Sequence, residues 1–548
     1  MLAALFPKFE FSGAAWLALT PLVFVLRGSK LRGGDETPMT LSQDDDGTHT
    51  LPPGGVARPE PPPEQFARLS WREAFGWGWF AGVIYHVISL SWIGHVTIGG
   101  MLVLAGYLSI ATGLWAMLIA LLWRNNRILS SMSNVHFALA GASGWVVLEW
   151  IKSHFLTGFP WNNLGVALHG NLPMIQIADH FGVYGISFII VFTNLTLLLT
   201  VLRLDREIRL MIRQRNDFQV FRLRPHLDFT LGMVLVVVTY GYGLACLFEK
   251  KPSGTIPVRV ALVQGNIPQN QKWNAERFYS ILDTYIGLTE SAALTRPDLI
   301  VWPESATPAG YLQNREVFDA VDALTREGGF DFIFGSNDVI DKRDYTGAFF
   351  IGRGQETFEF YHKMHLVPYG EYVPLGRWMP WMRKVVPIGN GFFPGTDPKV
   401  FTLTQSKLRV APLVCFEDLF PALARERTLR GADAFVNLTN GGWYGESAGI
   451  FQHVANAVFR SVETRRPTIR ATNTGVSCWI DPHGRIRDRM SPFVAGFQVT
   501  SVDILPGAPV TFYTRHGNVF VVGCLIILTL ALVRNILWQR KSFSTFVN

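Results

Sequence analysis

Long apolar segments on both sides of a block of ordinary composition constrain this chain more than any other feature. Of its 548 residues, 49% are hydrophobic and only 17% are charged, whereas soluble proteins have roughly a quarter charged. A membrane-spanning helix needs about 17–25 mostly apolar residues. Seven windows meet this need: 11–27, 74–94, 99–123, 136–155, 183–203, 228–248 and 516–538. We therefore predict a polytopic α-helical membrane domain over 1–250, a separate domain over 256–505 and a C-terminal transmembrane helix over 516–538.

The basic residues between these windows predict the orientation of the chain. They gather after the first, third, fifth and seventh windows, at Arg27, Lys30, Arg32, Arg124, Arg127, the arginines of 203–224, Arg534, Arg540 and Lys541. Because cytoplasmic loops carry an excess of Lys and Arg, we predict that these four are cytoplasmic and that 256–505 is extracytoplasmic. This places Met1 outside, so either the chain starts outside or a preceding helix is absent from this sequence. The same loops account for the net charge of +7, and no nucleic-acid partner is predicted.

Two segments of the membrane part differ from a plain spanning helix. Residues 33–67 are rich in Asp, Gly and Pro and cannot bury enough apolar surface to order themselves. We expect a disordered cytoplasmic loop there. The window 136–155 carries Glu149 and Lys152, which predicts that it faces protein or an interface.

The block 256–505 alternates short apolar, β-branched runs with helical patterns. The strand-like runs are 258–263, 299–302, 332–334, 410–414 and 434–438. The helical patterns are 274–295, 314–327, 420–430 and 448–465. This alternation predicts an α/β domain with a largely buried sheet.

Three isolated polar residues in this block, in a fixed order, suggest acyl-transfer chemistry. Cys415 comes after the run 408–414, Glu304 lies in a Trp-Pro-Glu-Ser stretch, and Lys363 lies in Tyr-His-Lys-Met. A cysteine can attack an ester or amide carbonyl if a base takes its proton and a cation holds the oxyanion. Glu304 is the candidate base and Lys363 the candidate oxyanion stabiliser. Singly, such residues are more often a small core side chain or surface charges, so the prediction depends on the ordered combination.

Other polar residues of the block have supporting or alternative roles. Glu371, within Pro-Tyr-Gly-Glu-Tyr-Val-Pro, could position Lys363 or shuttle a proton. Glu417 is two residues beyond Cys415 and on the same side if the strand continues. A disulfide between Cys415 and Cys478 would instead remove the nucleophile. No Cys or His spacing predicts a metal site, and core or interface roles are expected for His169, His180 and His453.

The order of Glu304, Lys363 and Cys415 resembles the catalytic triad of the nitrilase, or carbon–nitrogen hydrolase, superfamily. Nearly the whole chain is similar to one branch of that superfamily, the apolipoprotein N-acyltransferases. The stretches that carry this likeness, in sequence order, are 148–150, 157–161, 181–185, 263–269 with Trp273, 368–374 and 470–475. Each motif alone is modest, but together in a membrane frame they are specific.

The resemblance implies a fold, a reaction and a location. The fold would be an αββα sandwich over 256–505. Cys415 would take an acyl chain from a membrane phospholipid as a thioester and pass it to the α-amino group of the N-terminal S-diacylglyceryl cysteine of an apolipoprotein. The chain would lie in the bacterial inner membrane with its catalytic domain on the periplasmic side. No metal and no diffusible cofactor are implied.

The resemblance also assigns residue roles. It implies that the base is Glu304, the oxyanion stabiliser Lys363, the supporting carboxylates Glu371 and Glu417, and the residue near the substrate mouth Trp273. The membrane setting suits this chemistry because both substrates carry acyl chains. Drawing a lipid into water would cost about 0.8 kcal/mol per exposed CH₂ group.

Three positions depart from the family pattern, and two other functions stay open. Phe416 stands where the family often has Tyr, Gly441 where Asp is common, and Thr346 where Asn is usual. The triad alone also fits a membrane-tethered amidase with water as the acceptor. A transporter or receptor would tolerate the loss of Cys415. The seven windows favour the transferase, because a hydrolase of soluble substrates needs no polytopic frame.

Overall fold

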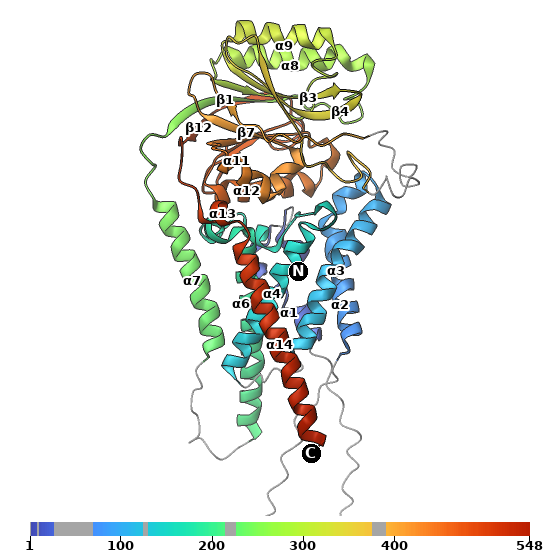
Figure 1. Ribbon diagram of the computed structural model, residues 1–548, viewed down its shortest axis with the longest axis vertical. Coiled ribbons are helices and arrows are strands. Elements are labelled where there is room, and N and C mark those ends of the chain that lie inside the picture. Colours follow the sequence, from blue (N-terminus) through green and yellow to red (C-terminus); the bar gives the residue numbers. More distant parts are fainter. Residues whose placement is uncertain are drawn as a thin grey trace, which may run out of the picture.

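An α/β domain stands at one end of a set of helices whose far ends point away from it (Figure 1). The computed structural model describes residues 2–7, 10–26, 69–123, 130–213, 226–374 and 391–547. The chain enters the α/β domain from α7 (Leu227–Phe248) and leaves it into α14 (Val519–Val547). The predicted loop at 33–67 lies outside the described residues.

Four helices in the described part of the chain are long and apolar enough to cross a membrane, which confirms four of the seven windows. They are α3 (Ile98–Trp123), residues Ala178–Arg209 of α6 (Ala178–Arg213), α7, and residues Val519–Leu537 of α14. The windows 74–94 and 136–155 hold α2 (Trp71–Ser89) and α4 (Ser131–Lys152), which have the length but are not among the four. In α4 the buried residues include Asn134, Ser143 and Glu149, so protein covers this helix as its charged residues predicted.

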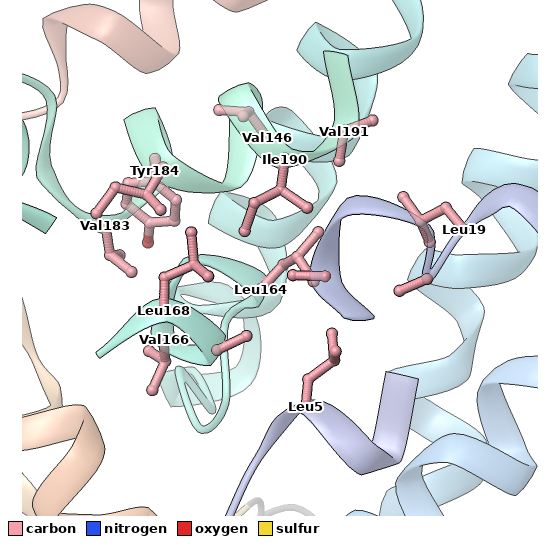
Figure 2. Close-up of a cluster of buried hydrophobic side chains, with 14 of the residues drawn as sticks. Leu5, Leu19, Val146, Leu164, Val166, Leu168, Val183, Tyr184, Ile190 and Val191 are labelled. Carbon is pink, nitrogen blue, oxygen red and sulfur yellow. The ribbon is translucent and has the colours of Figure 1, made fainter. Parts of the chain in front are cut away.

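The window 11–27 does not form a spanning helix. It is divided into η2 (Ser12–Trp16) and α1 (Thr20–Leu26). Pro21 falls in the first turn of α1, where its missing N–H costs nothing, whereas it would interrupt a continuous helix through this point. The divided segment packs inward instead. Leu19, together with Leu5 of the preceding η1 (Leu2–Leu5), faces Leu164 and Ile190 in the apolar core of the membrane part (Figure 2).

The α/β domain is two facing six-stranded sheets with helices outside each. The first sheet has the order β12 (Gly496–Ile504), β1 (Ile256–Gln264), β2 (Leu299–Val301), β3 (Asp331–Ile340), β4 (Arg343–Ile351) and β5 (Phe358–His362). The second has the order β11 (Ile486–Arg487), β10 (Cys478–Ile480), β9 (Thr468–Thr472), β8 (Ala434–Thr439), β7 (Arg409–Val414) and β6 (Phe401–Thr402). Strands β1, β2 and β3 are parallel, as are β7, β8 and β9. The expected αββα sandwich is confirmed.

Strand β1 shows how the sequence builds these layers. Val258, Val260 and Leu262 point into the core between the two sheets. Ala261 and Val263 point the other way, toward α8 (Phe278–Ala293) and α9 (Arg315–Gly328), which cover the first sheet (Figure 1). Because both faces of the strand are covered from Val260 onward, residues Val260 to Val263 form a continuous apolar run rather than an alternating one.

The helix α12 (Ala448–Thr464) lies between the second sheet and the membrane part, beside α11 (Pro421–Leu429) (Figure 1). Its apolar residues share one core with the transmembrane helices. Its buried amides also bind the membrane part: Gln452 accepts from Trp161 Nε1 at 2.8 Å and donates to the carbonyl oxygens of Pro7 and Ser89 at 2.8 and 3.0 Å. The two parts of the chain therefore meet through a packed, hydrogen-bonded interface.

Candidate active site

Glu304, Lys363 and Cys415 follow β2, β5 and β7, and these strands bring them to one edge of the sandwich. Lys363 Nζ lies 3.2 Å from Glu304 Oε1. The stretch that holds Glu304 crosses directly over β3, where a Cβ atom on Gly335 would come within 2.3 Å of the Pro303 carbonyl oxygen. Glycine is required there for so close a backbone approach. The structure thus brings together the three residues that the sequence singled out.

Lys363 is fully buried between two carboxylates. Its Nζ donates to Glu304 Oε1 and, at 2.6 Å, to Glu371 Oε1. Burial alone would lower the pKa of the lysine, but the charges of Glu304 and Glu371 outweigh it and raise this pKa well above its ordinary value. The lysine is therefore a permanent cation, which suits the oxyanion-stabilising role expected for it.

Cys415 is 7% exposed and starts the short helix η8 (Cys415–Leu419) directly after β7. Its φ of 51° lies in the left-handed region, a conformation that costs non-glycine residues energy and clusters at functional sites. Burial raises the pKa of the thiol well above its ordinary value, Glu304 raises it further, and Lys363 only partly offsets them. The resting group is therefore a thiol, and any attack by sulfur needs a base.

Glu371 contacts the lysine as expected, and its other oxygen accepts from the Val367 backbone N–H at 2.8 Å. Burial raises the pKa of the Glu371 carboxyl; the Lys363 charge lowers it but does not prevail, and Glu304 adds to the rise. Glu371 thus fixes the position of Lys363, and the positive charge of Lys363 is shared between the carboxylates of Glu371 and Glu304.

Glu417 would lie on the same side as Cys415 only if the strand continued, and the strand does not continue. β7 ends at Val414, and η8 turns the Glu417 carboxylate back under the strand end. There it accepts from Val414 N at 2.8 Å, Tyr361 Oη at 2.6 Å, Met364 N at 2.7 Å and His365 N at 3.1 Å. It ties the segment that carries Cys415 to the segment that carries Lys363.

Sequence reasoning missed two partners of Glu304. The backbone N–H of Asn440, which follows β8, donates to Glu304 Oε2 at 3.0 Å. The Nζ of Lys272 donates to the Glu304 carbonyl oxygen at 2.9 Å. Lys272 sits beside Trp273, whose side chain is 52% exposed. A lysine in a polar loop carries no signal of burial, so only the fold reveals it.

A second buried charge cluster was also missed. Asp418 accepts from His453 Nε2 at 2.8 Å and pairs with Arg470. Burial would raise the pKa of the Asp418 carboxyl, but these two partners hold it below its usual range. His453 Nδ1 lies 3.2 Å from the Tyr444 hydroxyl. His453 is thus a core residue, as expected from its lack of metal spacing.

The described residues contain no cluster of His, Cys, Asp and Glu that could hold a metal ion. Cys415 and Cys478 are both free, so the alternative disulfide is wrong for this structure. The chemistry that the geometry offers is that of a cysteine nucleophile with a carboxylate and an ammonium group beside it.

Comparison with known proteins identifies the family. A model of the apolipoprotein N-acyltransferase N-terminal domain matches residues 64–196, and a model of the carbon–nitrogen hydrolase domain matches residues 259–504. The apolipoprotein N-acyltransferase of Geobacter metallireducens is 34% identical over 84% of this chain and 85% of its own length. The chain belongs to the apolipoprotein N-acyltransferase family. The family enzyme of Caulobacter vibrioides is 30% identical over 83% of this chain and 85% of its own length.

Solved structures similar to this chain are more distant. An amidase from Nesterenkonia sp. is 18% identical, with a TM-score of 0.35, over 50% of this chain and 97% of its own. Membership in the N-acyltransferase family means that the chain is an acyltransferase with a membrane domain, which excludes the transporter or receptor reading.

The surroundings of Phe416 and Gly441, two of the departures from the N-acyltransferase pattern, suit the residues that are present. Phe416 packs against Phe159 of the membrane part, with ring centroids 6.1 Å apart, and against Phe420 at 5.1 Å. An aromatic hydroxyl would have to be accommodated in this apolar contact. Gly441 has a φ of 73°, which glycine adopts without the strain that a side chain would bring.

Proposed function

We propose that this chain transfers an acyl chain from a membrane phospholipid, through a thioester on Cys415, to the α-amino group of the N-terminal S-diacylglyceryl cysteine of an apolipoprotein. The observation that carries the proposal is the buried Lys363, held between Glu304 and Glu371 beside a protonated cysteine. Family membership supports the acceptor class, and the transmembrane helices support a lipid donor.

In the first step, Glu304 takes the thiol proton of Cys415 as the sulfur attacks the ester carbonyl of the phospholipid. The ammonium of Lys363 has three N–H donors. Glu304 and Glu371 accept two of them, and the third stabilises the oxyanion. When the C–O bond breaks, Glu304 returns the proton to the departing lysophospholipid oxygen, and the acyl group remains on sulfur.

In the second step, the neutral α-amine of the acceptor attacks the thioester carbonyl. Glu304 takes a proton from the attacking nitrogen, Lys363 again stabilises the oxyanion, and the C–S bond breaks. The proton passes from Glu304 to Cys415, which restores the thiol and leaves an amide on the acceptor. An amine that competes with water in this step requires a site from which bulk water is excluded, consistent with the burial of Cys415.

The proposal also assigns the parts of the chain and its orientation. The membrane part (1–250 with 516–538) would hold the catalytic domain (256–505) at the periplasmic face of the bacterial inner membrane. Support comes from basic residues near the C-terminal ends of two helices, Arg206 and Arg209 of α6 and Arg534 of α14. These helix ends point away from the catalytic domain (Figure 1), and cytoplasmic helix ends carry an excess of Lys and Arg. The half-exposed Trp273 would line the substrate mouth.

The test is mass spectrometry of the Cys415 peptide after the purified protein is incubated with phospholipid, with Cys415→Ala as control. The proposal predicts an acyl mass on Cys415 that a diacylglyceryl-cysteine peptide discharges as an N-acyl product. A folded protein whose Cys415 stays unmodified would contradict the lipid donor. Discharge to free fatty acid in the presence of the peptide would instead identify the amidase-like hydrolase.

A further inference from the structure

Lys272 is a second buried cation of the site, in contact with Glu304 and within electrostatic reach of Cys415, and the two-step mechanism above does not use it. It is 2% exposed, and its Nζ donates to the Glu304 carbonyl oxygen at 2.9 Å. The same segment is fastened to the site through Gln269, whose side-chain oxygen accepts from Asn440 Nδ2 at 2.6 Å. Burial of a charged lysine is unfavourable unless negative charge lies nearby, so the burial of Lys272 must be offset by negative charge in the site.

The ionised groups of the site supply that negative charge. The carboxylates of Glu304 and Glu371 and the ammonium of Lys363 together leave one net negative charge. The two nearby acids are balanced elsewhere: Asp418 pairs with Arg470, and Glu417 accepts from Tyr361, which also accepts from Arg427. Transfer of the thiol proton to Glu304 moves this negative charge onto the sulfur of Cys415, and a buried thiolate is unfavourable unless a cation lies close to it.

We propose that Lys272 is a positioning residue that holds the backbone of Glu304 and, as an ammonium, stabilises the thiolate that forms at Cys415 and later leaves the thioester. Glu304 takes the thiol proton, while Lys272 keeps its own protons and acts through its charge. The inference depends on the proposed function only in taking Cys415 as the nucleophile.

The environment of Lys272 makes this role sensitive to pH. Burial lowers the pKa of its ammonium to about 8, although the charges of Glu304 and Cys415, the two ionisable groups that act on it, raise it. Lys272 therefore loses its charge just above neutral pH, whereas Lys363 stays charged. Reactivity of Cys415 should rise less steeply with pH once Lys272 is neutral.

The experiment measures the rate of Cys415 alkylation by iodoacetamide from about pH 6 to about pH 10, read on the Cys415 peptide of the full-length protein in detergent. Lys272→Met should slow alkylation about tenfold at neutral pH, the effect of a one-unit rise in thiol pKa, and should abolish the bend near pH 8. Lys272→Arg, which keeps the charge, should stay within about threefold of the wild type at neutral pH and also lack the bend. The control is Lys251→Met, because Lys251 is an exposed lysine paired with Asp503.

A Lys272→Met protein with the same unfolding temperature and the same alkylation profile as Lys251→Met would overturn the inference. If Lys272→Met does not fold, the wild-type and Lys272→Arg profiles decide. The inference predicts that the wild-type alkylation rate bends near pH 8 and that Lys272→Arg removes this bend. A wild-type profile without the bend, or a bend that persists in Lys272→Arg, would overturn it. Alkylation uses no lipid, so its outcome is separate from acylation by phospholipid, which tests the proposed function.

Discussion

The carboxylate of Glu417 offers a quantitative test of how the site is held together. Glu417→Gln keeps the side-chain shape but replaces one acceptor oxygen with an NH₂ group. Three donors converge on Oε1, from Tyr361, Met364 and His365, and one on Oε2, from Val414. The amide oxygen will therefore take the Oε1 position, and the NH₂ group will face the Val414 N–H.

The expected cost follows from that arrangement. The Val414 N–H loses a bond to a charged acceptor and stays buried, and the other three bonds lose their charge assistance. Hydrogen bonds to charged groups contribute about 1.5–3 kcal/mol each, so we expect Glu417→Gln to lower the free energy of unfolding by about 2–4 kcal/mol. For a domain of this size the unfolding temperature should fall by roughly 5–15 °C.

Acyl transfer should also slow, because Val414 directly precedes Cys415 and Met364 directly follows Lys363. The assays are thermal unfolding of the detergent-solubilised protein and the rate of thioester formation on Cys415. Glu426→Gln is the matched control, since Glu426 is a partly exposed residue of α11 paired with Arg430 and should change stability by no more than about 0.5 kcal/mol. A Glu417→Gln protein that behaves like this control in both assays would refute the positioning role.

Three further outcomes are expected. Lys363→Met should reduce the rate of thioester formation by about 10²–10³-fold, as the loss of an oxyanion donor does, and a change under tenfold would contradict its role. Gln452→Leu breaks three buried hydrogen bonds between α12 and the membrane part. The free energy of unfolding should therefore fall by about 2–3 kcal/mol, seen as a lower unfolding temperature. An unchanged unfolding temperature would mean that packing alone holds this interface. His365 has a pKa lowered to about 4 by burial and by the Lys363 charge, against about 6.5 when unfolded. The unfolded chain thus binds more protons between these values, and stability should rise with pH across that window. His365→Phe should flatten this slope in unfolding temperatures measured from pH 4 to pH 7, and an unaltered slope would assign it to other groups.

Strands β1, β2, β3, β7 and β8, and the acidic and thiol residues that follow β2 and β7, could be predicted from sequence because each signal is local. A parallel strand covered on both faces is commonly an apolar run, and a polar residue just after it sits at the sheet edge, as Glu304 and Cys415 do. Strand β9 is also fully buried, but its sequence, Thr-Ile-Arg-Ala-Thr, is not apolar and it was not predicted. Strands β4 and β5 were not predicted, because Arg343–Ile351 and Phe358–His362 mix exposed and buried positions at the sheet margin. The order of residues predicted the cluster, while its hydrogen bonds came only from the fold.

The misses share a physical cause, since each depends on contacts between segments far apart in the chain. Glu417 turns under the strand because its carboxylate accepts hydrogen bonds from four donors in two segments. Its two-residue spacing from Cys415 gives no information about those donors. Lys272 is buried because a segment 32 residues later supplies its acceptor. The window 11–27 was apolar enough for a spanning helix, but its composition did not show that it would fold back against Leu164 and Ile190.

The polar contacts of α12 fix the position of the α/β domain relative to the membrane part. In a free-standing sandwich the outer face of that helix would meet water, but here Gln452 and Asn456 bind Trp161 and Asn162. The position of the Cys415 thiol relative to the transmembrane helices is therefore set by side-chain contacts as well as by the two peptide links to α7 and α14. In the proposed reaction, only an ester carbonyl at one depth of the lipid would reach the sulfur, so this interface would select which ester bond is cut.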